Sequence, residues 1–181
     1  MTGIPSPRLL DADTPVEIAS ARLVLRTMEE ADANSHYARW MNDSDIVRYT
    51  ESRYTTHSID GIHDYIAAMR RDPDSLLLAM ETKNDRRHIG NIKIGPVDWY
   101  HRSGDIGLLI GEADCWGQGY ASEAIAALAG YAFAALGLEK LTAGVYEPNT
   151  GCIRAFERAG FIREGVRRNQ YRFENGRVDV V

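Results

Sequence analysis

Apolar and polar positions alternate with two different periods along the chain, which predicts a protein built from both strands and helices. Residues 22–26 alternate at every second position, as expected of a strand. Two helical stripes follow, with apolar residues three and four positions apart, and Ser58 is suited to cap the second helix. The stripes consist of Ala33, Tyr37, Trp40 and Met41 in the first helix and of Ile59, Ile62, Ile66 and Met69 in the second.

The middle of the chain is rich in strand patterns, and the last third mixes both patterns. The predicted middle strands are residues 76–82, 87–97 and 104–111. A helix with apolar positions at helical spacing then runs to Gly137, a natural stop. The elements predicted after it are a strand over 140–146, a short helix from Asn149 to Gly160, and a closing strand pair over 161–168 and 175–181.

This order of elements predicts an α/β (α+β) fold, a three-layer α-β-α sandwich around a mixed central sheet. We expect one domain over residues 21–181, because a chain of 181 residues is an ordinary size for a single domain. Residues 1–20 show no sustained period, so we expect a tail or an added edge segment there.

Composition and charge narrow the function classes. The formal net charge of −5 argues against nucleic-acid binding by a broad basic surface. No apolar run approaches the ~20 residues of a membrane span, and the N-terminus lacks a secretory signal pattern. Two cysteines are too few for a disulfide framework, which favours reduced thiols and a cytoplasmic location. The five histidines show no metal-ligand spacing, so we expect no metal site.

The segment DCWGQGYASEA places two glycines directly before a helical pattern. Gly117 and Gly119 would let a ligand approach the backbone amides at the start of that helix, where the helix dipole favours an anion. The loop contains no lysine, which excludes a Walker-type phosphate loop, and Ser122 breaks the dinucleotide-binding fingerprint. The alternative is a simple glycine turn before a packed helix. A backbone pyrophosphate cradle is therefore one of two interpretations of this motif.

A second junction between a strand and a helix lies in EPNTGCIRAFERAGF. Asn149 is well suited to cap the helix that follows, and capping alone would explain it. Two neighbouring junctions of this kind could, however, flank one ligand between them.

With both motifs in place, the chain resembles the GNAT superfamily of acetyl-CoA-dependent N-acetyltransferases, and within it the branch of ribosomal-protein N-terminal acetyltransferases. The resemblance covers roughly residues 20–181. It rests on three segments in order and at family-like spacing: residues 108–124, 149–161 and 175–181.

The resemblance implies a central sheet in which residues 106–110 splay away from residues 141–146, and it implies acetyl-CoA as the co-substrate. The pantetheine arm would pair with the backbone near Leu109 and Ile110, and Asn149 would bond its side. The pyrophosphate would be held by the backbone of Gly117, Gln118, Gly119, Tyr120 and Ala121, with Ser122 close by.

Three positions depart from the family pattern. Asp114 stands where a glutamine or arginine is usual, so a basic helper at the phosphates is missing from the motif. Phe156 replaces the tyrosine that many members use as a general acid, so that role must move. Cys152 stands at a position that is often serine in this branch.

Acetyl transfer to an amine needs a base, an oxyanion donor and, to a lesser degree, an acid for the leaving thiolate. Cys152 lies on the first turn of the second helix and is the candidate acid, although a buried packing role is also open. Glu51 and Asp105 are the candidate bases, and either could instead be solvated or paired with arginine, as Glu51 could be with Arg53. Arg53 could also meet an anionic group of the acceptor, such as the phosphate of a nucleotide-linked amino sugar.

The sequence therefore predicts an N-acetyltransferase that moves an acetyl group from acetyl-CoA to a primary amine by direct attack. The acceptor could be a protein N-terminus or a small amine such as an amino sugar or polyamine. The alternative is a non-catalytic acyl-CoA-binding module, which the missing tyrosine keeps open. We expect no nucleic-acid or membrane partner, and a homodimer is a further expectation.

Overall fold

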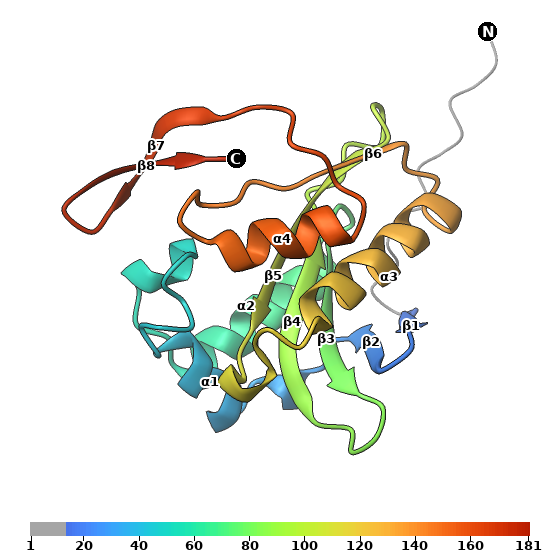
Figure 1. Ribbon diagram of the computed structural model, residues 1–181. Coiled ribbons are helices and arrows are strands. Elements are labelled where there is room, and N and C mark those ends of the chain that lie inside the picture. Colours follow the sequence, from blue (N-terminus) through green and yellow to red (C-terminus); the bar gives the residue numbers. More distant parts are fainter. Residues whose placement is uncertain (1–13) are drawn as a thin grey trace, which may run out of the picture.

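The computed structural model describes residues 14–181, and its core is a six-stranded sheet between two layers of helices (Figure 1). In spatial order the strands are β1 (Glu17–Ala19), β2 (Leu23–Thr27), β3 (Leu76–Thr82), β4 (His88–Ile94), β5 (Ser103–Ile110) and β6 (Lys140–Thr142). Neighbouring strands pair antiparallel as far as β5, whereas β5 and β6 are parallel. The predicted mixed sheet is thus confirmed.

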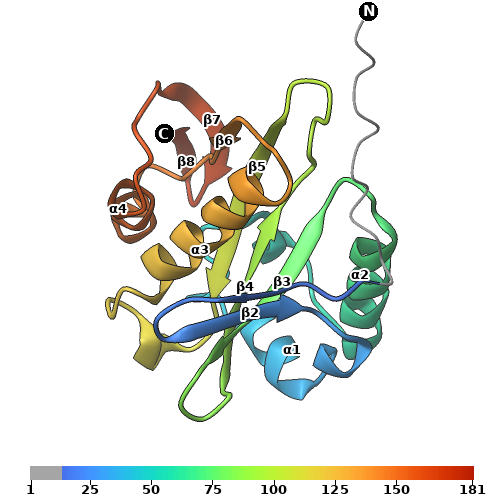
Figure 2. The ribbon, with the colours of Figure 1, turned by 90° about the vertical axis from the view of Figure 1, so that its right-hand side faces the viewer.

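Helices cover both faces of this sheet. Figure 2 shows α1 (Ser35–Met41) and α2 (Ile59–Arg71) on one side, and α3 (Tyr120–Ala134) and α4 (Thr150–Arg158) on the other. Three short 3-10 turns were not predicted: η1 (Glu30–Asp32), η2 (Glu51–Tyr54) and η3 (Ala113–Cys115). No helix within residues 14–181 combines the length and the hydropathy needed to cross a bilayer.

The central strand β3 explains why both faces are covered. All of its residues are buried, and successive side chains point to opposite faces of a strand. Leu77 and Ala79 pack with the helices α1 and α2, whereas Leu78 and Met80 belong to the core beneath α3 and α4. A strand that is apolar on both faces requires a layer of helices on each side, which gives the three-layer sandwich.

A separate two-stranded hairpin ends the chain, with β7 (Arg167–Phe173) paired to β8 (Gly176–Val180). The predicted strand over 161–168 is wrong for most of its length, because residues 161–166 form no strand. The tight turn at residues 174–175 pairs Phe173 with Gly176, so the partner of β8 must be the segment immediately before that turn.

The segment expected as a tail or an edge is structured in part. β1 lies within it and forms the edge strand of the sheet, antiparallel to β2. Residues 1–13 lie outside the described part of the chain.

Glu112 ties the end of β5 to the layer of α1. One carboxylate oxygen accepts hydrogen bonds from the Trp40 indole at 2.7 Å and from Arg39 at 2.8 Å, while the other accepts one from Arg87. Burial raises the pKa of this carboxyl group, but the bonds from Trp40 and Arg87 outweigh burial and leave the pKa below its ordinary value. The ionised form of Glu112 therefore stabilises the fold.

We predict that Glu112→Gln lowers the free energy of unfolding by about 1–3 kcal/mol near neutral pH, because the charge-assisted bonds of Arg87 and Arg39 to this buried carboxylate are lost. A carboxyl group with a lowered folded-state pKa stabilises above its unfolded pKa, and this contribution is lost as the pH falls through the folded value. The difference between wild type and variant should accordingly shrink below about pH 4.

Thermal melts across that pH range would measure the effect. Glu139→Gln, which removes an exposed pair with Arg102, is the control and should be near neutral. A Glu112→Gln effect that is equal at pH 3 and pH 7 would show that Glu112 acts through packing alone.

Candidate functional site

β5 and β6 share a short parallel ladder and then separate. Residues 103–105 pair with residues 140–142, and there the ladder ends. Beyond it the chain changes partner, since Val145 and Val181 exchange two backbone hydrogen bonds of 2.9 Å. The Glu147 amide likewise donates to the Asp179 carbonyl at 3.0 Å. The predicted strand over 140–146 is therefore correct only as far as Thr142, and the expected splay is confirmed.

The register of β4 and β5 decides which peptide groups of β5 face the gap. The Asp105 carbonyl accepts from Gly95, and the Gly111 amide donates to Ile89, so both point toward the β4 side. Alternate residues of an antiparallel strand direct their peptide groups to the same neighbour. Leu109 therefore faces β4, and only Ile110 of the two expected pantetheine partners faces the gap. The peptide groups on the gap side belong to Ile106, Leu108 and Ile110.

Trp116 already contacts one of these groups. Its indole N–H donates to the Ile110 carbonyl at 3.0 Å, and its side chain is 46% exposed. Trp116 thus lies over the mouth of the gap.

The glycine loop opens α3 with free amides. Gly117 and Gly119 adopt left-handed backbone conformations with φ of 74° and 85°, which favour glycine. Gly119 is the N-cap of α3, and no side chain caps this helix end. The first amides of a helix have no partner within the helix, so those after Gly119 remain available to an anion.

The acidic residue in this loop does not leave an unbalanced charge. Asp114 pairs with Arg87 through contacts of 2.7 and 3.0 Å, and this pairing lowers the pKa of Asp114. Arg22 also reaches the loop: it donates to the Gln118 carbonyl at 3.0 Å and pairs with Glu123 at 2.7 Å. Two guanidinium groups therefore lie at the loop even though the motif itself lacks a basic residue.

The start of α4 forms the second junction. Asn149 caps this helix, and its side-chain oxygen accepts from the Cys152 amide at 3.2 Å. Burial raises the pKa of the Cys152 thiol to about 11, so the thiol stays protonated at neutral pH. Phe156 is buried against Phe161 at 5.0 Å between ring centroids and has a purely apolar role.

Glu51 and Arg53 both meet the phenol of Tyr146, four residues beyond the end of β6. The phenol donates to the Glu51 carboxylate and accepts from Arg53 at 3.0 Å. Burial, followed by the contact with Glu51, raises the pKa of Tyr146 to about 12. A direct pair between Glu51 and Arg53 was one alternative from the sequence, and the two residues instead share this contact with Tyr146.

The terminal nitrogens of Arg53 make further hydrogen bonds within the protein. They reach the Thr50 carbonyl at 2.7 Å, the Tyr54 hydroxyl at 2.6 Å and the Arg172 carbonyl at 2.9 Å. Arg53 therefore connects the segment before α2 to the terminal hairpin. The sequence hypothesis that Arg53 holds an anion on the acceptor loses its support, because its hydrogen bonds are used internally.

Asp105 lies at the last register pair before β5 and β6 separate. It accepts a hydrogen bond from Thr142 at 2.9 Å. Desolvation by the surrounding protein raises the pKa of Asp105, against the lowering effects of Thr142 and of the nearby positive charges of Arg167 and Lys93. Among the described residues, no hydrogen bond or ion pair joins any two of the three candidate catalytic residues, Cys152, Glu51 and Asp105.

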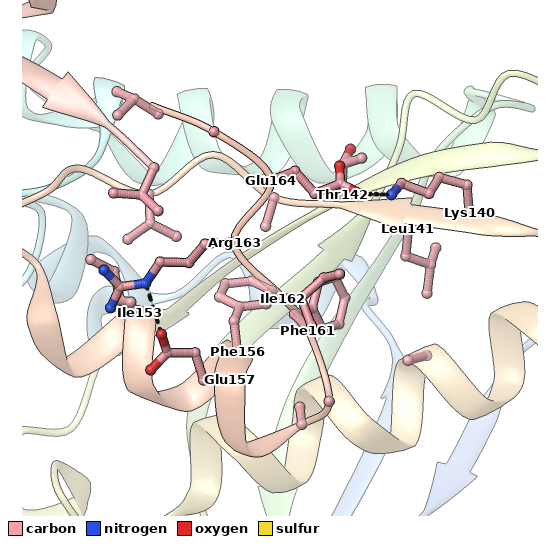
Figure 3. Close-up of a pocket in the computed structure, with 18 of the residues that line it drawn as sticks. Lys140, Leu141, Thr142, Ile153, Phe156, Glu157, Phe161, Ile162, Arg163 and Glu164 are labelled. Atoms are coloured by element: carbon pink, nitrogen blue, oxygen red, sulfur yellow. Dashed lines mark hydrogen bonds and ion pairs between the residues drawn. The ribbon is translucent and has the colours of Figure 1, made fainter. Parts of the chain in front are cut away.

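Two cavities lie near these elements. One, of about 400 Å³, opens between the sheet and the layer of α1 and α2, and its wall includes Gly107 and Leu108 of β5. The other, of about 630 Å³, lies between β6, α4 and residues 161–167 (Figure 3). Figure 3 shows an apolar floor with Phe156 and Phe161, and the ion pairs Lys140–Glu164 and Arg163–Glu157 at its rim. Only the smaller cavity shares β5 with the gap.

Sequence reasoning missed the polar residues of the smaller cavity. Asn91 and Lys93 lie on β4, on the face that β4 turns toward α1 and α2. The available signal was their alternation with Ile92 and Ile94, which shows a strand that is polar on one face inside an otherwise apolar sheet.

Comparisons with known proteins agree with this geometry. Residues 22–162 match the acetyltransferase (GNAT) domain family. A Bacillus subtilis (strain 168) relative, the uncharacterized N-acetyltransferase YoaA, is 32% identical over 161 residues, covering 86% of this chain and 87% of the relative.

Solved structures share the fold. The spermidine N-acetyltransferase of Vibrio cholerae, in complex with CoA and spermine, has a TM-score of 0.79 at 23% identity, covering 88% of this chain and 92% of that one. RimJ of Mycobacterium smegmatis, in complex with CoA-disulfide, has a TM-score of 0.77 at 21% identity, covering 93% of this chain and 85% of that one. The splayed sheet, the glycine loop at α3 and the match over residues 22–162 lead to one conclusion: this chain belongs to the GNAT family of acetyltransferases.

Proposed function

We propose that the protein transfers an acetyl group from acetyl-CoA to the primary amine of a small acceptor. The observation that carries this proposal is the gap beside β5, which is flanked by the uncapped start of α3 and by the Asn149-capped start of α4. Such a gap presents peptide groups along one side and helix amides at the α3 end, a combination suited to an extended amide-containing arm that carries phosphates.

The residues present fit this co-substrate, which supplies an acetyl thioester when bound. The pyrophosphate would meet the amides of Gly119, Tyr120, Ala121 and Ser122, with Gly117 and Gln118 forming the turn before them. Leu108 and Ile110 would pair with the pantetheine arm, and the Trp116 indole would release the Ile110 carbonyl. Asn149 lies at the opposite side, next to Cys152.

Asp105 is the base that the geometry favours. It lies at the closed end of the gap, and its raised pKa makes it a stronger proton acceptor than an ordinary aspartate. Glu51 already accepts a hydrogen bond from Tyr146. In the proposed step the amine forms a C–N bond to the acetyl carbon, the C–S bond breaks, and the amine proton passes to Asp105.

Cys152 would act as a hydrogen-bond donor to the departing sulfur. A thiol with a pKa of about 11 is almost entirely protonated at neutral pH, which suits a donor and disfavours a nucleophile. Direct attack by the amine is therefore preferred over an acetyl-cysteine route.

The candidate acceptors of this protein are suggested by solved structures that share its fold. The structural relatives include a spermidine N-acetyltransferase, so a polyamine is a precedent within the fold, whereas a protein N-terminus stays a prediction from the sequence. The 400 Å³ cavity beside β5 favours a small amine. A non-catalytic acyl-CoA-binding module is the second candidate, and the apolar Phe156 is the observation that favours it. The ribosomal-protein branch, a cytoplasmic location and a homodimer stay predictions from the sequence.

We predict that Gly119→Val abolishes acetyl-CoA binding, because a branched side chain would cover the amides of α3 and disfavour the left-handed turn. Wild type should be stabilised by acetyl-CoA through mass action, and the variant should show no shift of melting temperature.

Gly137→Val is the matched control, since Gly137 has a φ of 69° and lies after α3, where an added Cβ would meet nothing within 4 Å. It should suffer the same backbone strain and keep acetyl-CoA binding. Equal affinity of Gly119→Val and wild type would refute the phosphate assignment.

We predict that acetyl-CoA turnover, read as thiol release with a panel of amines, rises between about pH 6 and pH 8 as the amine loses its proton. Asp105→Asn should lower kcat/KM by about 10²- to 10⁴-fold, the usual worth of a general base. Glu51→Gln should cost less. A larger loss in Glu51→Gln would move the base to Glu51, and acetyl-CoA binding without thiol release for any amine would favour the non-catalytic module.

We predict that Cys152→Ala lowers kcat by about ten- to a hundred-fold, roughly 1.4–2.7 kcal/mol, whereas Cys152→Ser keeps a donor and retains much of the activity. Acetyl-CoA affinity should change little in both. Measuring kcat, affinity and melting temperature separates this role from packing, because equal rates for the two variants, with a difference only in stability, would eliminate Cys152 as the donor.

A further inference from the structure

The cavity between the sheet and the α1–α2 layer is here called the acceptor pocket. Its lining includes a lysine and several uncharged polar side chains. Its wall comes from Tyr37 and Met41 of α1, from Ser52 and His57, from Gly61, Ile62 and Tyr65 of α2, from Leu77 of β3, from Asn91 and Lys93 of β4, and from Gly107 and Leu108 of β5. No aspartate or glutamate is among these lining residues. Lys93 is the one lysine or arginine in this lining, and Asp105 lies just outside it.

Lys93 gives the lining a positive charge, and the carboxylate on which this charge acts, Asp105, lies beyond ion-pair distance. Within residues 14–181, no hydrogen bond or ion pair within 4 Å engages its ammonium group. Lys93 pairs in register with Gly107, whose missing side chain leaves open space, because a Cβ there would meet nothing within 4 Å. The ammonium group thus borders free volume directly beside β5.

Asn91 adds a second donor that lacks a partner. Only 5% of the residue is exposed, and no hydrogen-bond acceptor among the described residues engages its amide nitrogen. The Tyr37 phenol is near enough for Asn91 to lower its pKa, although no hydrogen bond joins the two side chains. The orientation of the amide follows from His88. Nε2 of His88 lies 3.0 Å from the Gly90 carbonyl, so it carries a proton, and the Asn91 atom at 2.8 Å from the same nitrogen must be the oxygen.

A buried N–H without an acceptor costs free energy, on the order of 1–3 kcal/mol in typical proteins, unless a ligand or water satisfies it. Asn91 and Lys93 are two residues apart on one face of β4, so both donors serve the same region of the pocket. Two donors, one of them charged, with no acidic residue in the lining, match a carboxylate or phosphate group.

We propose that the acceptor pocket binds an oxyanion through Lys93 and Asn91, so that the acceptor is a small amine that also carries a carboxylate or a phosphate. This inference rests on the proposed function, because it names the acceptor class of the same site. Asp105 lies diagonally across from Lys93 on β5, which places the base for the amine beside the site for the anion. A diamine would set its second ammonium against Lys93.

The test compares matched acceptors that differ in one group. 4-Aminobutyrate and putrescine have the same length, with a carboxylate or an ammonium at the far end; phosphoethanolamine and ethanolamine form the phosphate pair. Wild type should prefer the anionic member of at least one pair by about 10- to 100-fold in kcat/KM, and the pair that responds identifies the oxyanion.

Lys93→Met should remove this preference, because kcat/KM should fall more for the anionic member of a pair than for its partner, and Lys93→Glu should reverse the preference. Asn91→Asp, an isosteric change, should weaken only the anionic acceptors. Lys140→Met is the control, since Lys140 pairs with Glu164 at the rim of the other cavity. This variant should leave kcat/KM unchanged for both members of each acceptor pair. A Lys93→Met effect that is equal for both members of each pair, or a wild-type preference for putrescine, would overturn the proposal.

Binding of 4-acetamidobutyrate and of phosphoethanolamine, measured by calorimetry without acetyl-CoA, separates this inference from the proposed function. We expect at least one of them to bind wild type and to lose about ten-fold or more in affinity in Lys93→Glu. Such binding in a protein that fails to bind acetyl-CoA would refute the proposed function and leave the oxyanion site standing. Turnover of diamines by a protein that binds neither oxyanion would refute the oxyanion site alone.

Discussion

The change of partner made by the chain after Thr142 is the constraint on which the rest of the structure depends. A parallel pair of strands would normally continue its ladder, and every peptide group would then be used. Here Val145 bonds with Val181, so the second half of β5 has no partner strand on the gap side, where the Ile110 carbonyl accepts from the Trp116 indole instead. Burying such groups without partners is unfavourable, and a bound amide-containing arm would satisfy them. The gap therefore arises because the chain after β6 leaves β5 and pairs with the end of the terminal hairpin.

The acceptor side is held by aromatic stacking around one guanidinium. Tyr146 stacks on Tyr171 at 5.2 Å, and Tyr49 stacks on Phe173 at 5.5 Å between ring centroids. The Arg53 guanidinium lies over Tyr146 at 4.9 Å and bonds its phenol. The segment before α2 and the terminal hairpin, which are far apart in sequence, thus form one wall next to Ser52 and His57 of the small cavity.

Local sequence patterns were enough to predict much of the fold and the acetyl-CoA side of the proposed site. The helices and the middle strands follow from periodicity, and the glycine loop and Asn149 follow from the chemistry of helix starts. The register of β7 depended on the turn at residues 174–175, and Leu109 and Leu108 could be distinguished only by their hydrogen-bond parity with β4. The roles of Arg53, Lys93 and Asn91 depend on which partners each has in space, and a single sequence does not contain that information.

Because residues 143–146 leave β5 and pair with β8, one short stretch of backbone borders both the donor gap and the acceptor wall. Any motion that widens the gap must also move Tyr146, and with it the Glu51 and Arg53 contacts that fix the opposite wall. Under the proposed function, occupancy on one side would be linked energetically to affinity on the other, and thermodynamic linkage would make this effect reciprocal. The backbone of residues 143–146 is thus the shared element through which the two proposed substrate sites would influence each other.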